Sequence, residues 1–212
     1  MLFVAWNLFL AALPVGLAHL LVAALTRHGG VRRLPTVGCA LLAAVWLAFL
    51  PNTCYLLTEW RHLVLQPIFA HLIQSAGADR TAMILTLAAA SFFVLYSSVG
   101  VLAFVLAIRP VERFMASRGR RFSRYAPVLF FLLSLGVYLG LVVRLNTWDL
   151  VCRPQTVLSA ALDAVSRPEV LSLHLAFAGF LWGLYLAVDR WIDAVATRFV
   201  RPPPTAESTS RT

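Results

Sequence analysis

The chain has 212 residues, of which 60% are hydrophobic and only 13% are charged, and its net charge is +9. A soluble domain carries about 25% charged residues, so the composition excludes a water-soluble globular protein and predicts a lipid bilayer around the fold. All 18 basic residues are arginine. They lie in short segments between apolar runs, which favours membrane orientation over nucleic-acid binding as the reason for the charge.

Five apolar runs are long enough to cross a bilayer, which takes about 20 residues. The sequence therefore predicts an all-α fold, a polytopic bundle of transmembrane helices that forms a single domain over residues 1–200. Residues 201–212, in which three prolines follow Arg201, are expected to form a disordered cytoplasmic tail. The five predicted spans are 2–26, 36–57, 81–108, 125–145 and 169–189.

Arginines are concentrated in alternate connections between the predicted spans. The connections after the first and third spans are strongly basic, those after the second and fourth are balanced in charge, and further arginines follow the fifth span. Basic connections remain on the cytoplasmic side of a membrane, so the alternation predicts an outer N-terminus and an inner C-terminus. A four-span chain would place the two most basic connections on opposite sides.

The two balanced connections are not plain linkers, because apolar residues recur in them at helical spacing. Such patterns indicate short interfacial helices on the outer surface of the membrane. Pro67 interrupts the first pattern. The apolar positions are Leu63, Leu65, Ile68, Phe69, Leu72 and Ile73 after the second span, and Val157, Leu158, Ala161, Leu162 and Val165 after the fourth.

Two glycine pairs at four-residue spacing lie in the last two spans, Gly136 with Gly140 and Gly179 with Gly183. Paired small residues let helix backbones approach closely, although chance produces the same spacing in an apolar segment. If the pairs are contacts, the more economical expectation is that both spans pack on neighbours within this chain. A dimer through these glycines is the less economical alternative.

A polar stripe marks the outer end of the second span. Asn52, Tyr55, Glu59 and His62 follow one another at intervals of 3, 4 and 3 residues, which places them on one helix face. Pro51, just before them, is expected to kink the helix. Glu59 and His62 are candidate catalytic groups or metal ligands. In the alternative interpretation they form a solvated helix end, with Tyr55 as an interfacial residue.

A second polar cluster follows the fourth span, in the segment Arg144-Leu145-Asn146-Thr147-Trp148-Asp149. Arg144 should extend its guanidinium toward the outer surface, where it could pair with Glu59 or Asp149, or hold a phosphate or carboxylate. Asn146 and Trp148 are candidate ligand-binding residues, and Asp149 is a candidate acid or metal ligand. The alternative is an ordinary interfacial arginine beside a membrane-belt tryptophan.

Few other residues carry recognisable chemistry. His174, near the outer end of the fifth span, is a candidate metal ligand or a hydrogen-bonding partner for a neighbouring helix. Cys54 and Cys152 both belong to the outer side, where a disulfide and two free thiols are the alternatives. The sequence has no nucleotide-binding, zinc-protease or serine-hydrolase motif, and it identifies no cofactor.

Together the two polar motifs resemble a family of bacterial polytopic membrane proteins of unknown function, the DUF1361 type. The resemblance rests on Leu50-Pro51-Asn52-x-x-Tyr55-Leu56-Leu57-Thr58-Glu59-x-x-His62-Leu63 and on Arg144-Leu145-Asn146-Thr147-Trp148-Asp149, and it covers most of the chain. The family usually has Asp at position 59 and Ser at position 147, and both differences keep the chemical type. The resemblance implies a bacterial inner-membrane setting and no particular activity.

Three functional hypotheses follow from these residues. The first is an outer-face site for an anionic or lipid-linked envelope ligand, in which Arg144 holds the anion; in an enzyme, Glu59 or His62 would be the base and Asp149 an acid or metal ligand. The second is a non-catalytic assembly subunit that docks a membrane-protein partner. The third is a small-solute or proton pathway. The candidate residues of the site are Asn52, Tyr55, Glu59, His62, Arg144, Asn146, Trp148 and Asp149.

Overall fold

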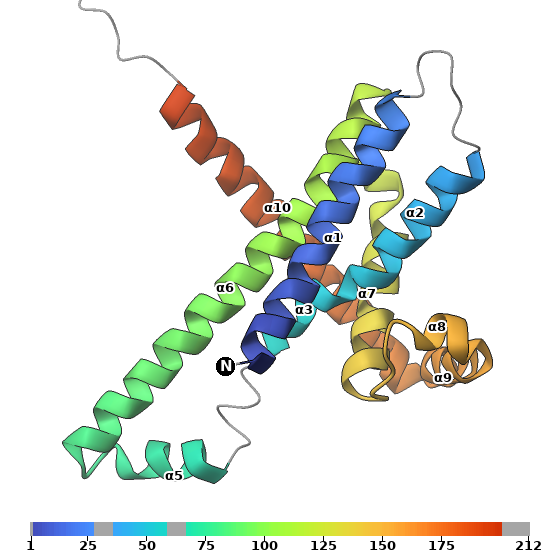
Figure 1. Ribbon diagram of the computed structural model, residues 1–212. Helices are drawn as coiled ribbons and strands as arrows, with labels where there is room; N and C mark the ends of the chain where they lie inside the picture. Colours follow the sequence, from blue (N-terminus) through green and yellow to red (C-terminus); the bar gives the residue numbers. More distant parts are fainter. Residues whose placement is uncertain (1, 28–35, 59–66, 201–212) are drawn as a thin grey trace, which may run out of the picture.

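The computed structural model describes residues 2–27, 36–58 and 67–200, and all regular structure in these ranges is helical (Figure 1). The predicted all-α class is therefore confirmed. Glu59, His62 and the predicted tail 201–212 lie outside the described residues. The helices are α1 (Leu2–Arg27), α2 (Thr36–Phe49), α3 (Pro51–Thr58), α5 (Pro67–Ser75), α6 (Arg80–Ser117), the short 3-10 helix η1 (Phe122–Arg124), α7 (Ala126–Leu141), α8 (Asp149–Cys152), α9 (Pro154–Ser166) and α10 (Pro168–Val200).

Within the described ranges, four helical stretches are long and apolar enough to cross a membrane: Val4–Thr26, Val37–Thr58, Arg80–Ser117 and Pro168–Arg198. Their length and composition identify the chain as a membrane protein. The predicted fourth span, 125–145, corresponds to the apolar helix α7, which has only 16 residues. It is shorter than predicted because the chain leaves the helix after Leu141.

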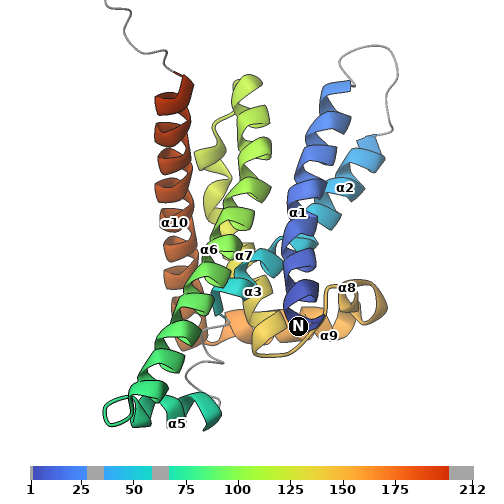
Figure 2. The ribbon, with the colours of Figure 1, turned by 60° about the vertical axis from the view of Figure 1, so that its left-hand side comes forward.

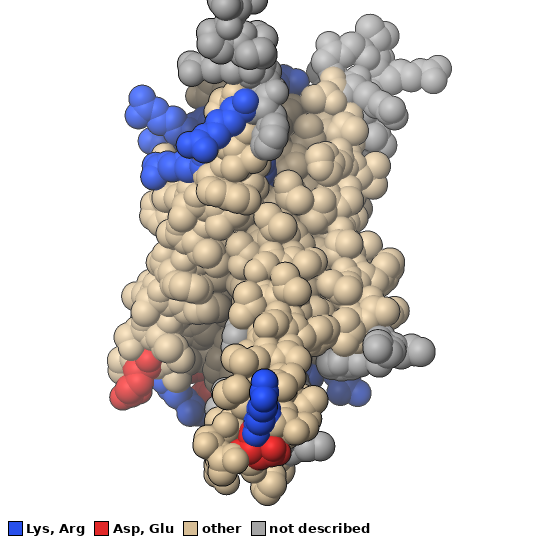
Figure 3. Space-filling model, turned by 90° about the vertical axis from the view of Figure 1, so that its left-hand side faces the viewer, with Lys and Arg blue, Asp and Glu red and all other residues tan. Residues whose placement is uncertain are grey.

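The helices form a bundle, and different short helices and connecting segments lie at its two ends (Figures 1 and 2). The N-terminus, α5, α8 and α9 lie at one end, and the turn with η1 and the C-terminal part of α10 lie at the other. On the face shown in Figure 3, the charged side chains visible at the second end are all basic, whereas acidic and basic side chains are visible together at the first. We call these the mixed end and the arginine end.

The short helices of the mixed end occupy the two connections in which the sequence predicts them. α5 begins at Pro67, because proline suits the first turn of a helix and has no N–H to donate. α9 likewise begins at Pro154. In α9, Val157 and Ala164 are buried against the bundle, while Leu158 and Leu162 are exposed. The exposed leucines give α9 an apolar outer face that suits the membrane surface.

A break at Leu50 divides the second apolar stretch into α2 and α3. Pro51 has no N–H and cannot continue the hydrogen-bond ladder of α2. The Leu50 carbonyl instead accepts hydrogen bonds from the Thr53 amide at 3.2 Å and the Thr53 hydroxyl at 2.8 Å. α3 packs against α1, α6 and α7, and residues Pro51 to Cys54 are all buried. The break predicted from Pro51 therefore places a buried polar helix inside the bundle.

Three glycines allow α3 to approach its neighbours. A Cβ atom on Gly100 of α6 would lie 2.6 Å from Leu56 Cβ, and one on Gly136 of α7 would lie 2.5 Å from Pro51 Cγ. A Cβ atom on Gly140 would overlap the hydroxyl of Tyr55. The pair Gly136 and Gly140 thus packs within this chain, as predicted.

The second glycine pair makes no close contact within the described part of this chain, so of the two alternatives that the sequence left open, packing on a neighbouring span does not hold for it. Gly179 and Gly183 of α10 are exposed, and a Cβ atom on either would meet nothing within 4 Å. The physical reason is the rotation of α10, which packs on α7 through its opposite side, where Ala178, Leu181 and Tyr185 are buried. An equal spacing of glycines therefore has different consequences in neighbouring helices.

Ion pairs join α6 to α10 near the arginine end. Arg109 lies 3.2 Å from Asp189 and also binds Asp193, and Arg113 lies 2.7 Å from Asp193. The side chains of Arg109 and Asp189 are each only 17% exposed. Charged groups with this little exposure are screened less by solvent than surface pairs are, so the network should stabilise the contact between the two helices.

Removal of one partner from this network should destabilise the protein. We expect Arg109→Gln to lower the free energy of unfolding by about 1–3 kcal/mol, between the effects typical of surface pairs and of buried pairs. Arg190→Gln, an exposed arginine on the same helix as Asp189, is the matched control and should change stability by less than about 0.5 kcal/mol. Thermal unfolding in detergent measures both, and equal melting temperatures for the two variants would contradict the expectation.

Candidate functional site

A cavity of about 350 Å³ is lined by residues from the start of α1, the helix α3 and the segment after α7. It brings the two polar motifs of the sequence together. Its lining includes all five predicted ligand-binding residues, which are Asn52, Tyr55, Arg144, Asn146 and Trp148. The remaining lining residues are Trp6, Asn7, Leu10, Phe49, Gly140, Leu141, Leu145 and Thr147.

The packing of α3 fixes two of these side chains. Asn52 and Tyr55 are three residues apart and therefore point to the same side of the helix. Asn52 is only 6% exposed, and Tyr55 lies over Gly140 of α7, where a side chain on the neighbouring helix would displace its ring. α3 therefore presents an amide and a phenol hydroxyl to the same cavity.

The opposite wall depends on how α7 ends. The Leu145 amide donates to the Leu139 carbonyl at 3.0 Å, which turns the chain back on the helix. Arg144 lies in this turn with φ of 63°, in the left-handed region that costs a non-glycine residue about 1–2 kcal/mol. Arg144 is exposed, and no carboxylate in the described ranges pairs with it. The fold thus places at a polar cavity an arginine with a strained backbone and, within the described ranges, no carboxylate partner.

Asp149 has a different position from the one expected of a catalytic acid. Its carboxylate accepts a hydrogen bond from the backbone N–H of Asn146 at 2.7 Å, and Asp149 is 9% exposed. It does not line the cavity, and it does not pair with Arg144. The geometry makes Asp149 a residue that holds the turn from Asn146 to Asp149 in shape and so positions Asn146 and Trp148 at the cavity.

His174 lies apart from the cavity, in the contact between α7 and α10. It is 2% exposed, and its Nδ1 atom lies 2.9 Å from the Ser134 hydroxyl. The ring of Tyr138 meets the imidazole edge-on, with centroids 5.1 Å apart. This is the hydrogen bond to a neighbouring helix that the sequence offered as the alternative to metal binding. Among the residues described, no cluster of three His, Cys, Asp or Glu side chains could hold a metal ion.

Sequence reasoning missed the contribution of α1 to the cavity. Trp6 and Asn7 line it from the N-terminal turns of the helix. The only signal was an amide and an indole near the outer end of a predicted span, which membrane-belt residues also produce. The disulfide alternative does not occur, because Cys54 is a buried thiol inside α3 and Cys152 is an exposed thiol on α8.

The fold and the cavity define a polytopic helical membrane protein with a polar site at one end of its bundle. The profile of the family described as "Protein of unknown function (DUF1361)" matches residues 6–184, and the chain belongs to this family. The matched range includes every residue that lines the cavity, from Trp6 of α1 to Trp148. No curated protein and no solved structure matches the chain.

Proposed function

We propose that this protein binds an anionic or lipid-linked envelope ligand in the polar cavity, at the outer face of the bacterial inner membrane. The observation that carries the proposal is Arg144, whose guanidinium has no carboxylate partner among the described residues and whose strained backbone lies beside a buried amide and a tyrosine. Strain of this kind is often retained at functional sites because the side chain has a task there.

The proposed topology has five spans, with the mixed end outside and the arginine end in the cytoplasm. Charge supports this orientation, since arginine-rich connections stay on the cytoplasmic side. α7 is about 24 Å long at 1.5 Å per residue, and a bilayer core is about 30 Å thick. The segment from Val142 to Thr147 would complete the crossing. The single domain would then extend over residues 1–200.

The chemistry of the lining suits an anion. A guanidinium donates two parallel hydrogen bonds to a phosphate or a carboxylate. The amides of Asn52 and Asn146 and the hydroxyl of Tyr55 add neutral donors and acceptors, which suit a head group that also carries hydroxyl or amide groups. Trp148, which is 57% exposed, supplies an amphipathic ring at the entrance.

Glu59 and His62 belong to the same proposal as the groups that would process the ligand. In the sequence they continue the spacing of Asn52 and Tyr55 on one helix face. A carboxylate and an imidazole beside a bound phosphate or carboxylate could transfer a proton. The binding proposal does not depend on this step, so it is tested without them.

The test is ligand-dependent thermal stability of the purified protein in detergent, with glycerol 3-phosphate as the soluble probe. We expect the probe to raise the melting temperature of the wild type, because a ligand that binds only the folded state stabilises it. Arg144→Gln should weaken binding about tenfold to a hundredfold, the effect of one hydrogen bond to a charged group. Arg190→Gln should leave the shift unchanged. An equal shift in wild type and Arg144→Gln would contradict the proposal.

A second candidate function is the non-catalytic assembly subunit, and the exposed glycine face of α10 favours it. Gly179 and Gly183 leave room for a close helix partner. Gly183→Leu would fill that room without touching the cavity. A change in oligomeric state in this variant, with the glycerol 3-phosphate shift retained, would support assembly as a separate property. An unchanged oligomeric state in Gly183→Leu would count against the assembly function.

A further inference from the structure

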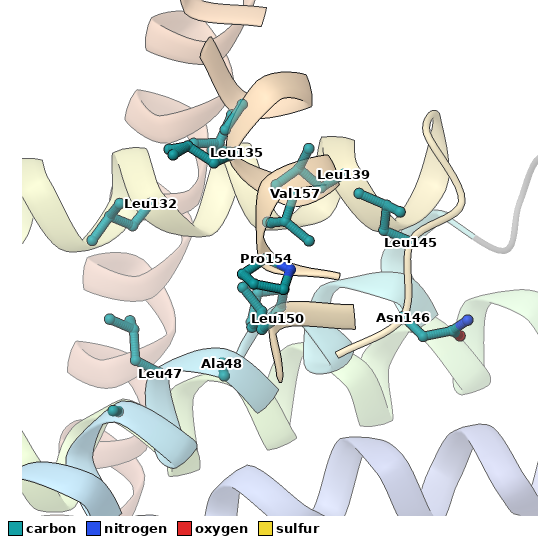
Figure 4. A pocket seen from close by; sticks show the side chains of 15 residues that line it. Leu47, Ala48, Leu132, Leu135, Leu139, Leu145, Asn146, Leu150, Pro154 and Val157 are labelled. Atoms are coloured by element: carbon teal, nitrogen blue, oxygen red, sulfur yellow. The ribbon is translucent and has the colours of Figure 1, made fainter. Parts of the chain in front are cut away.

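An apolar groove adjoins the polar cavity. Its volume is about 460 Å³, and it lies between α2 and α7 with α8 and α9 along one side (Figure 4). The groove and the polar cavity share two lining residues, Leu145 and Asn146. In Figure 4 these residues lie at one end of the groove and Leu132 lies at the other. The two hollows are therefore neighbours that meet at the turn after α7.

The two hollows differ in their chemistry. Apart from Asn146, every residue that lines the groove is apolar. Leu47 and Ala48 form the α2 wall, Leu135 belongs to the α7 wall, and Val157 closes the α9 side. The polar cavity beyond the turn contains the guanidinium and the amides. The lining thus changes from apolar to cationic across Leu145 and Asn146, the residues that the two hollows share.

The break at Leu50 explains why the groove exists. α2 packs against α1, whereas α3 turns inward and packs against α6 and α7. α7 in turn packs against α10 and α3. α2 and α7 therefore diverge from their common neighbour α3, and Pro51, which packs on Gly136, lines the groove between them. α8 and α9 line one side of the groove.

We propose that the two hollows together hold one amphipathic molecule, a single-chain lipid with a phosphate head group. This inference rests on the proposed function, because the phosphate is the anion that Arg144 would bind. The apolar chain would lie in the groove and the head group in the polar cavity, joined at Asn146. From Leu132 to Leu139 the α7 wall is about 10 Å long, so the hydrocarbon chain must reach at least that length.

The position of the bound lipid's hydrocarbon chain tests the proposal better than the contribution of that hydrocarbon chain to the binding affinity. Lipid tails are as apolar as the residues of the groove, so moving a chain from the bilayer into the groove brings no hydrophobic gain. The test therefore uses the full-length protein in nanodiscs and a sixteen-carbon alkyl phosphate with a photoreactive diazirine near the middle of its chain. Irradiation followed by peptide mapping shows where the chain lies.

We expect the label on groove residues of α2, α7 and α9. Ala48→Phe should fill the groove and reduce this labelling at least fivefold, and Ala161→Phe, on the α9 side, should do the same if Ala48→Phe fails to fold. Ala40→Phe is the matched control, because Ala40 is exposed on the same helix and does not line the groove. Arg144→Gln should also reduce labelling, because the head group fixes the chain.

Three results would overturn the inference. The first is labelling spread evenly over the exposed faces of α6 and α10. The second is groove labelling that persists in Arg144→Gln, which would make the groove a general lipid site. The third is equal groove labelling by a photoreactive two-chain phosphatidic acid. If glycerol 3-phosphate still stabilises the protein in these cases, the proposed function remains, and only the inference that the groove holds the hydrocarbon chain fails. If that stabilisation is absent in the wild type, both fail.

Discussion

We expect Gly100→Ala to destabilise the protein strongly, although alanine is the better helix former. The new Cβ atom would lie 2.6 Å from Leu56 Cβ and 3.2 Å from the Thr53 carbonyl oxygen. A backbone oxygen and a Cβ atom cannot move away by a side-chain rotation, so α3 as a whole would have to move away from α6. Overpacking of this kind costs about 1–3 kcal/mol, which exceeds the gain of up to about 1 kcal/mol from helix propensity.

The effect of Gly100→Ala should also reach the cavity, because α3 carries Asn52 and Tyr55. Gly179→Ala is the matched control on an exposed helix face, where a Cβ atom meets nothing within 4 Å. It should leave stability unchanged or raise it by up to about 1 kcal/mol. Unfolding in detergent measures both variants. If Gly100→Ala were as stable as Gly179→Ala, α3 would not pack on α6 as the structure has it.

Arg144→Gly should change stability and ligand binding in opposite directions. Glycine adopts the left-handed backbone at position 144 without strain, so we expect the free energy of unfolding to rise by about 1 kcal/mol. The same substitution removes the guanidinium from the cavity. We expect binding of glycerol 3-phosphate to weaken about tenfold to a hundredfold, with the protein more stable than the wild type.

Arg144→Ala separates the two effects. Alanine also lacks the guanidinium but keeps the strain of the left-handed conformation, so it should lose binding without the gain in stability. Thermal unfolding and a binding titration on the three proteins measure the difference. Wild-type affinity in Arg144→Gly would mean that the strained arginine serves the turn rather than a ligand, and the binding proposal would be wrong.

The elements of the fold follow closely from the sequence, because apolar runs and prolines are local signals. The helix at 67–75 begins at a proline within a predicted apolar pattern, and the helix at 154–166 begins at a proline just before one. Pro51 indicates the break that separates α2 from α3. The end of α7 could not be predicted in this way. It depends on the left-handed conformation of Arg144 and on the bond from Leu145 to Leu139, which only the folded surroundings stabilise.

The candidate site was predictable as a list of residues but not as a cavity. The motif around Asn52 and the motif around Arg144 are about ninety residues apart in the sequence, and sequence reasoning could only state that a site requires them to meet. Whether they meet depends on the packing of α3 between α6 and α7. The role of Asp149 was equally hidden, because a carboxylate that caps a turn and one that faces a ligand look alike in sequence.

The two glycine pairs also show that residue spacing alone does not predict which face of a helix packs against its neighbours. Gly136 with Gly140 and Gly179 with Gly183 have equal spacing and similar apolar surroundings in the sequence. The first pair packs against Pro51 and Tyr55, whereas a Cβ atom on either glycine of the second pair would meet nothing within 4 Å. The rotation of each helix about its axis decides between the two results, and it is set by the whole set of neighbouring side chains rather than by the glycines.

The most direct test of the central claim is whether a bound phosphate lipid protects the cavity. Thr147→Cys, in a background with Cys39→Ser and Cys152→Ser, would place one reactive thiol in the cavity lining, while Cys54 is buried. We expect a long-chain alkyl phosphate to slow modification of this thiol at least fivefold, and we expect the protection to be lost when Arg144→Gly is added. An unchanged modification rate at saturating lipid would contradict a ligand site at the junction of the two motifs.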